Sequence, residues 1–153
     1  MNIFVLDADV KKCAEYHCDK HCVKMILEST QLLCGVHGYT GSAAPYKMTH
    51  KNHPCSIWAR ESLANYEWLL SLALELCKEY TFRYAKKHKC EDVLNWCIEN
   101  KPNIPQKGVT NFALAMPEAY KIGNAVASYR AYYLFEKKHI AQWTKRNKPV
   151  WYN

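Results

Sequence analysis

A stripe of apolar side chains in the middle of the chain constrains the fold more than any other feature of the sequence. From about residue 57 to residue 86, these side chains recur mostly at intervals of four or seven residues, the spacing of one face of an α-helix. The serine just before the stripe is a residue type that often caps a helix N-terminus. The sequence therefore predicts one long central helix over residues 57–86, capped by Ser56. The stripe consists of Ile57, Ala64, Trp68, Leu72, Leu76 and Tyr80.

Helical patterns also account for most of the remaining chain. Asp9, Asp19 and Asn124 each precede such a pattern and are favourable N-cap residues. Two glycines near residue 36 can end the second helix. Only Ile3–Leu6 has the character of a short extended piece, so the predicted fold class is all-α. We predict helices over residues 10–17, 20–36, 91–99 and 125–142, a loop over 38–55, and a short segment near 111–116.

Size and composition predict a single compact helical domain over residues 1–153, ending in a basic, aromatic tail. A chain of 153 residues, 49% of them hydrophobic, is long enough to bury a core of ordinary size. No stretch approaches the ~18 uncharged apolar residues of a membrane span. The first residues lack the basic start of a signal peptide. We therefore expect an intracellular, monomeric protein that does not associate with membranes.

The net charge of +7 points to a polyanionic partner. Lysine and arginine side chains that neutralise phosphates release counterions, which favours binding to nucleic acid. A basic surface that is merely solvated explains the charge equally well. The positive residues are interleaved with aromatic ones, which is unlike a disordered basic tail.

The eight cysteines are scattered over the predicted helices and include no Cys-x-x-Cys pair. At apolar helical positions a free thiol behaves as a small hydrophobic group, so we expect all eight to be reduced. One cluster has the composition of a zinc site, but its His and Cys pairs point about 100° apart around a helix and no second pair of ligands is evident. We therefore expect no bound metal. The cluster consists of Cys13, His17, Cys18, His21 and Cys22.

The segment from Asp19 to Gln31 is the first that could carry chemistry. His21 and Glu28 are seven residues apart, which places them on one face of a helix, and Lys24 lies between them on the same side. The alternative is an exposed polar face with one weak Lys–Glu pair. Apolar residues on the other side are expected to face the core. They are Val23, Ile26, Leu27, Leu33 and Cys34.

A second candidate is the polar loop that leads into the central helix. It contains His50, Lys51, Asn52 and His53 directly before a predicted helix N-terminus. Helix N-termini offer free N–H groups to phosphates, so this loop could contact a DNA backbone. A simple capping loop explains the same residues equally well.

A third candidate is the C-terminal tail, in which basic and aromatic residues alternate from Lys145 to Tyr152. Such a segment suits phosphate contact combined with base stacking. The alternative is a tail whose aromatic side chains pack on the helices.

In order and approximate spacing, these segments resemble the motifs of phage pyrimidine-dimer DNA glycosylases of the endonuclease V type. Residues 19–21 (Asp-Lys-His), followed by Glu28, match a helix start with a catalytic glutamate seven residues after the histidine. Residues 52–53 (Asn-His) stand where the family has Gly-His before aromatic residues and a long helix. Residues 149–152 (Pro-Val-Trp-Tyr) match its Pro-x-Trp-Tyr ending. Each motif alone is weak, but the three in order cover most of the chain.

The resemblance implies a DNA repair glycosylase with AP lyase activity that excises pyrimidine dimers from double-stranded DNA, its expected partner, and needs no cofactor. An amine attacks C1′ of the damaged nucleotide, and a glutamate, here Glu28, stabilises the sugar cation and moves protons; His21 is a further catalytic candidate. The family uses the α-amine of a threonine exposed by removal of the first methionine. Here residue 2 is asparagine, whose size disfavours that removal. The candidate amines are those of Met1, Asn2, Lys20 and Lys24.

Two departures from the family pattern leave other functions open. The family has arginines that grip DNA one residue before and three residues after the glutamate, where this chain has Leu27 and Gln31. The chain could therefore act on another modified base in viral DNA, or bind nucleic acid without catalysis. The candidate DNA-binding residues are Lys20, Lys24, Gln31, His50, Lys51, Asn52, His53, Arg130, Lys145, Arg146, Trp151 and Tyr152.

Overall fold

The computed structural model describes residues 1–153 and contains helices but no strand, which confirms the all-α prediction. None of these helices has the length and apolar character needed to cross a membrane. The α-helices are α1 (Val10–Tyr16), α2 (Asp19–Tyr39), α3 (Pro54–Glu61), α4 (Leu63–Tyr84), α5 (Glu91–Glu99) and α6 (Ala125–Glu136), and two 3₁₀ turns cover Glu118–Tyr120 and Lys138–Ile140.

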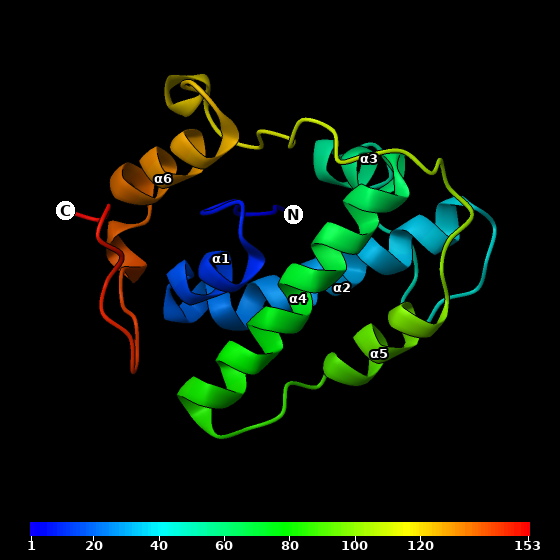
Figure 1. Cartoon of the computed structure of the whole chain (residues 1–153), viewed down its shortest axis with the longest axis horizontal. Coiled ribbons are helices and arrows are strands. Elements are labelled where there is room, and N and C mark those ends of the chain that lie inside the picture. The colour runs from blue at the N-terminus through cyan, green and yellow to red at the C-terminus, as the bar shows by residue number, and fades with distance from the viewer.

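Helices α2 and α4 cross at the centre of the molecule, and the other elements pack around them (Figure 1). Helix α1 packs on α4, while α3 and α5 each contact both α2 and α4. The chain then runs from α5 past α3 to α6, beside which the C-terminal tail lies (Figure 1). The centre of the core consists of fully buried side chains of α2 and α4. They include Ile26, Leu33, Leu69, Leu72 and Leu76.

The predicted long helix over residues 57–86 is broken at Ser62. This residue has extended backbone angles (φ −150°, ψ 154°), and its side chain accepts a hydrogen bond from the Asn65 N–H, so it caps α4. Ser56, the predicted cap, lies inside α3, and His53 caps that helix through its ring nitrogen. Serine is a favourable cap at either position, so composition alone does not place the break.

The predicted boundaries of α2 and α6 are wrong in detail. Asp19 is the first residue of α2 rather than its cap, because its carboxylate accepts hydrogen bonds from Arg83 and Thr144 instead. Helix α2 continues to Tyr39 through both glycines; at Gly38 a Cβ would approach the Met48 Cβ to 2.9 Å. Helix α6 is capped by Asn124 as predicted but ends at Glu136, before a 3₁₀ turn.

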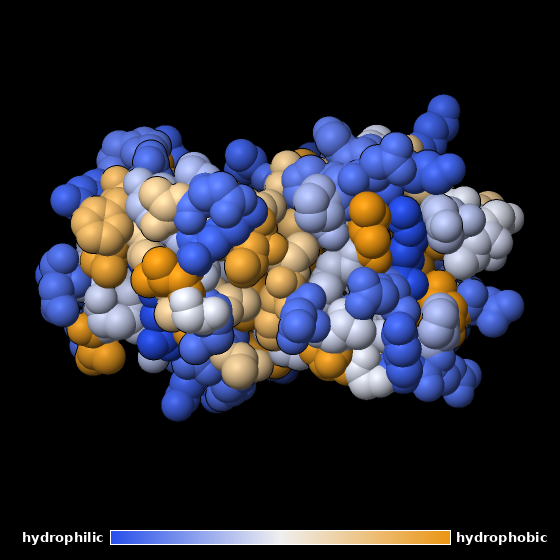
Figure 2. Space-filling view, turned by 90° about the horizontal axis from the view of Figure 1, so that it is seen from above, coloured by the Kyte–Doolittle hydropathy of each residue, from blue (hydrophilic) through white to orange (hydrophobic).

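Residues 110–116, expected to form a short element, are extended and without helix. We name them the crossing segment, because they run over the upper side of the molecule in Figure 1, from α3 towards α6. At its start, Thr110 is tied to Asn65 of α4 by two hydrogen bonds of 2.8 and 2.9 Å, and Phe112 stacks on Trp58 of α3. Figure 2 looks onto this upper side and shows apolar side chains near the middle, with hydrophilic and apolar side chains mixed towards both ends.

The first six residues pass through the middle of the molecule (Figure 1), and Ile3–Leu6 are buried without forming a strand. They lie along the face of α2 that carries His21 and Glu28. Of the residues predicted to face the core, Ile26, Leu33 and Cys34 are buried, Leu27 is half-buried, and Val23 is 39% exposed, so the prediction is wrong for Val23. The face that carries His21 and Glu28 is buried as well, because the first residues cover it.

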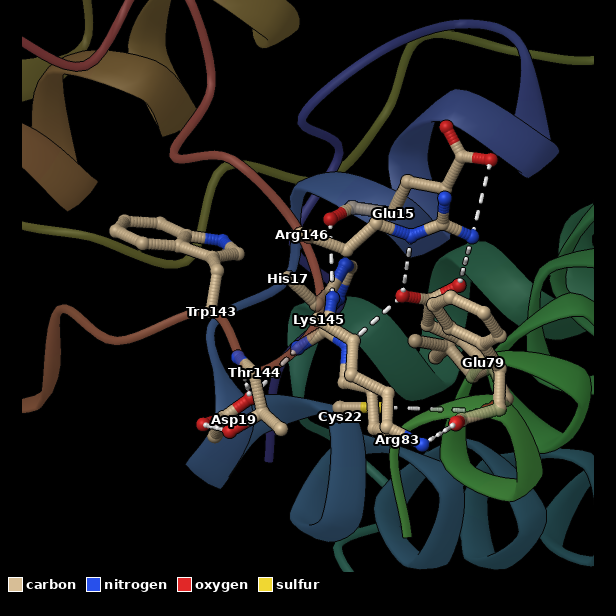
Figure 3. A network of polar contacts seen from close by, with 12 residues as sticks. Glu15, His17, Asp19, Cys22, Glu79, Arg83, Trp143, Thr144, Lys145 and Arg146 are labelled. Atoms are coloured by element: carbon tan, nitrogen blue, oxygen red, sulfur yellow. Dashed lines mark hydrogen bonds and ion pairs between the residues drawn. The ribbon is translucent and has the colours of Figure 1, made fainter. Parts of the chain in front are cut away.

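A polar network joins the C-terminal tail to the start of α2 and the end of α4 (Figure 3). The buried Arg83 side chain pairs with Glu79 at 2.8 Å and with Asp19 at 3.0 Å. From the tail, Arg146 donates two hydrogen bonds to Glu79, at 3.0 and 2.9 Å, and the Thr144 hydroxyl donates to Asp19 at 2.6 Å. The network fixes residues 144–146 on the folded domain.

Candidate active site

Glu28 lies at the centre of the candidate site, on the face of α2 that meets the N-terminus. Its Oε1 accepts a hydrogen bond from the Asn2 backbone N–H at 3.0 Å and lies 3.3 Å from the α-amine of Met1. Its Oε2 lies 3.6 Å from the Lys24 ammonium, one helical turn away. The structure thus brings three of the predicted residues, Met1, Asn2 and Lys24, together around the carboxylate of a fourth, Glu28.

The N-terminus is held in place by both of its first side chains. The Met1 side chain is only 4% exposed and packs against the hydrophobic core. The Asn2 side chain contacts the crossing segment and the buried hydroxyl of Tyr129 on α6. The sequence places Tyr129 on the inward face of the last helix, but nothing in the sequence indicates that it reaches the N-terminus.

His53 borders the same site from the start of α3. Its Nδ1 accepts a hydrogen bond from the Cys55 N–H at 3.0 Å, so the proton of the neutral ring is on Nε2. Burial lowers the pKa of His53, and the positive charges of the Met1 amine and His50 lower it further, against an opposing effect of Glu28. His53 therefore lies within the electrostatic reach of both the amine and the carboxylate.

His21, the other predicted catalytic residue, is not beside Glu28. The two are about 10 Å apart along α2, because seven residues each rise ~1.5 Å. The His21 ring stacks on Phe4 with a centroid distance of 4.3 Å, and its Nδ1 lies 2.6 Å from the Tyr133 hydroxyl. Burial lowers its pKa to about 3, so the ring is neutral at physiological pH. Its contacts are those of a core residue that supports the N-terminal segment.

Lysines surround this part of the molecule at the surface. Lys20 and Lys24 are exposed on α2, while Gln31 is half-buried. Lys137, which the sequence analysis did not select, places its ammonium 5.8 Å from the centre of the Phe4 ring and 4.9 Å from that of Tyr132. These cations can approach a phosphate backbone that passes the site.

The polar loop before α3 presents a second group of exposed polar side chains. His50, Lys51 and Asn52 are exposed. The Arg60 guanidinium lies 4.0 Å from the centre of the exposed Tyr39 ring and donates to the Lys51 carbonyl at 2.6 Å. The loop is thus tied to the helices on either side, and its side chains remain accessible.

The candidate residues of α6 and the tail are engaged mainly within the chain. Arg130 donates to the Leu6 carbonyl and to Asp7, and its guanidinium lies 5.2 Å from the centre of the Trp151 ring. The Arg146 guanidinium pairs with Glu79 and Glu15. These contacts hold the tail to the domain, as expected from the alternative in which the tail packs on the helices.

The remaining tail residues also have partners within the chain. Lys145 donates to the Phe82 carbonyl at 3.2 Å. Trp151 packs against Tyr16 and Tyr133, and Tyr152 packs against Trp143. In this conformation the aromatic rings of the tail stabilise the end of the fold.

No three His, Cys, Asp or Glu side chains are grouped so that they could hold a metal ion. All eight cysteines are free and buried. Burial raises the pKa of several of these thiols, among them Cys13 and Cys22, each to about 12. The titratable groups gathered around the Glu28 carboxylate are the Met1 amine, the Lys24 ammonium and the His53 imidazole.

A comparison with protein families places this geometry in a known context. The family model described as pyrimidine dimer DNA glycosylase matches residues 1–92, which is 92 of the 153 residues. The matched region contains Met1, Asn2, Lys24, Glu28 and His53, whereas Tyr129, Lys137 and the crossing segment lie outside it. No curated protein and no solved structure matches the chain. Because the match covers more than half of its length, the chain belongs to the pyrimidine dimer DNA glycosylase family.

Proposed function

We propose that the protein excises pyrimidine dimers from double-stranded DNA as a monomeric N-glycosylase with AP lyase activity, using the α-amine of Met1 as nucleophile and Glu28 as the group that moves protons. The observation that carries this proposal is the distance of 3.3 Å between the amine and the carboxylate. A nucleophile within hydrogen-bond reach of its base is the arrangement that covalent catalysis requires.

Among the candidate amines, that of Met1 has the most support. An α-amine has a reference pKa near ~8 and a lysine one near ~10.4, so a larger fraction of α-amines is neutral at cellular pH. Removing Met1 would also forfeit the burial of its side chain, which typically stabilises a fold by about 1.5–3 kcal/mol. If Met1 were removed, the nitrogen of Asn2 would take over, since it lies 3.0 Å from the same carboxylate oxygen.

The proposed reaction begins when the neutral amine attacks C1′ and the base leaves with the electron pair of the glycosidic bond and takes a proton from water. The negative charge of Glu28 stabilises the sugar cation while this bond breaks, and Glu28 then accepts the proton that the bound amine loses. The proton returns to O4′ when the sugar ring opens to a Schiff base. Loss of a C2′ proton then expels the 3′ phosphate and cuts the strand. Water finally hydrolyses the Schiff base and frees the amine.

DNA must be deformed to bring C1′ to this amine, because the reacting groups lie against the protein core. We propose that the damaged site is opened by extrusion of a nucleotide and a bend in the duplex, held by lysines around the site. Since Leu27 and Gln31 replace the arginines of the family, contacts beside Glu28 are less cationic. This difference favours, as a second candidate, action on another modified base.

Borohydride trapping tests the proposal, because it reduces the Schiff base and leaves a stable protein–DNA adduct. Duplexes with a single cyclobutane dimer, other modified bases or no lesion should be compared. We expect an adduct with the dimer duplex and none with the undamaged one. Trapping only on a different modified base would select the second candidate. Binding without any adduct would contradict catalysis by an amine.

A further inference from the structure

The side chain of Asn2 makes an unusually complete set of hydrogen bonds for a residue next to a chain terminus. Its Oδ1 accepts from the Ile3 N–H at 2.8 Å and from the Tyr129 hydroxyl at 2.9 Å, and the Cys55 thiol lies 3.8 Å away. Its Nδ2 donates to the Ala115 carbonyl at 3.0 Å. These partners come from the N-terminal segment, α3, the crossing segment and α6.

The partners also fix the orientation of the amide. An Ile3 N–H can only donate and an Ala115 carbonyl can only accept, so exchanging the Asn2 oxygen and nitrogen would place donor against donor and acceptor against acceptor. Only an amide of this length meets both demands in the same place. Asparagine at position 2 is thus matched to this environment by its donor and acceptor together.

The Tyr129 hydroxyl contacts both the crossing segment and the N-terminal segment and so joins the two. The ring is fully buried, and the hydroxyl faces two acceptors, Asn2 Oδ1 at 2.9 Å and the Ala113 carbonyl at 2.8 Å. It also accepts a hydrogen bond from the Ala115 N–H at 3.3 Å. Because the other end of the crossing segment is anchored at Thr110, the hydroxyl is held between fixed groups.

We propose that Asn2 and Tyr129 are positioning residues that, through the crossing segment, hold the Met1 amine against Glu28. This inference rests on the proposed role of that amine. Chain termini are ordinarily mobile, and a nucleophile gains rate only if it is held where it reacts. We call the contacts of the Asn2 side chain with Tyr129 and the crossing segment the clamp. The clamp fixes the backbone of Asn2, and the Asn2 N–H and the Met1 amine both contact the same oxygen of Glu28. It also makes residues 110–129, which lie outside the matched family region, part of the active site.

Two substitutions test the clamp. Asn2→Leu keeps the size of the side chain and, being as bulky as asparagine, does not promote removal of Met1, which the intact mass verifies. Tyr129→Phe removes only the hydroxyl. The matched control is Tyr66→Phe, which removes another buried hydroxyl, one that contacts His37 on α2 and the Cys97 carbonyl on α5. For each protein, the single-turnover rate of adduct formation at saturating dimer DNA and the DNA affinity are measured.

A misplaced nucleophile loses rate rather than binding. We expect Asn2→Leu to slow the saturated rate on the order of 10²-fold, and Tyr129→Phe by about tenfold because one hydrogen bond is lost. Affinity should change by less than about threefold, since phosphate contacts dominate it. The double variant should be no slower than Asn2→Leu alone, because both act through one clamp. Tyr66→Phe should keep the original rate.

Several outcomes would overturn the clamp. They are an unchanged rate in Asn2→Leu or Tyr129→Phe, a loss of affinity parallel to the loss of rate, and an equal slowing in Tyr66→Phe, which would indicate a general effect on stability. If the unaltered protein forms no adduct with the dimer duplex or with any other modified base, the amine chemistry itself is refuted and the clamp with it. The failure of the proposed function is therefore distinguishable from failure of this inference.

Discussion

Replacing Glu28 with glutamine separates a catalytic carboxylate from a structural one. Glutamine keeps the size of the side chain and an oxygen that can accept from the Asn2 N–H, at 3.0 Å in the native protein. It removes the charge that lies 3.3 Å from the Met1 amine. The sugar cation would then lack a negative charge beside it, and the amine would lack a group that accepts its proton. We expect base release to slow on the order of 10²–10³-fold.

Folding should be affected less than the rate. The Lys24 side chain is 69% exposed, so its pair with Glu28 is a surface ion pair worth about 0.5 kcal/mol. The pair with the Met1 amine is buried, so losing its charge should lower stability on the order of 1–3 kcal/mol, although the glutamine oxygen can still accept from both nitrogens. Affinity for DNA should stay the same or rise, because a negative charge close to the phosphates has gone. A loss of rate in protein that remains folded and binds DNA is the signature of a group that acts in the transition state.

The assay is single-turnover base release and strand cleavage on a duplex with one cyclobutane dimer, with affinity and thermal unfolding measured in parallel. Base release is measured as cleavage of the glycosidic bond, because the cyclobutane ring keeps the freed base joined to its neighbour. Glu75→Gln is a matched control, since it removes a carboxylate paired with Lys78 at 3.2 Å on α4. Both variants change the net charge equally. Base release at the native rate in Glu28→Gln would refute the reasoning, as would equal slowing in the control.

Three further predictions follow from other contacts. The logarithm of DNA affinity should fall linearly and steeply with the logarithm of salt concentration, because lysine and arginine contacts release counterions; a flat response would argue against phosphate contacts. The pKa of His21 is lowered to about 3 in the folded protein, so the unfolded chain binds more protons between pH ~6.5 and ~3. His21 should therefore contribute to a loss of stability as pH falls through that window, and its ring signals in NMR spectra should stay neutral at pH 5; a ring that titrates near 6.5 would contradict its burial. Arg146→Met leaves Glu79 with Arg83 as its only cation and should lower stability by about 1–2 kcal/mol and increase hydrogen exchange in residues 143–152, whereas unchanged exchange would show that the network does not hold the tail.

Local sequence patterns were sufficient to predict the helices but not where one of them breaks. The periodic stripe predicted helical structure on both sides of Ser62, and two serines within seven residues offered equally good caps. The break depends on the extended chain around Pro105, whose carbonyl accepts from the Leu63 N–H. That contact joins residues far apart in the sequence and leaves no local pattern.

The candidate site was also predictable only in part, because some of its contacts join residues far apart in the sequence. His21 and Glu28 share a helix face as their spacing indicated, and the resemblance led to the amines at the N-terminus. The burial of that face was not predictable, because it depends on the first six residues crossing it. The bond between Asn2 and Tyr129 joins residues 127 positions apart, and the spacing of residues within a helix carries no information on such a contact.

The most direct test of the account is the location of the covalent bond after borohydride trapping on dimer-containing DNA. Digestion of the adduct and mass spectrometry of the modified peptide identify the nitrogen that attacked C1′. The account predicts a single adduct on the α-nitrogen of Met1, the amine that lies 3.3 Å from Glu28. An adduct on Lys20 or Lys24, or no adduct at all with a duplex that the protein binds, would contradict it.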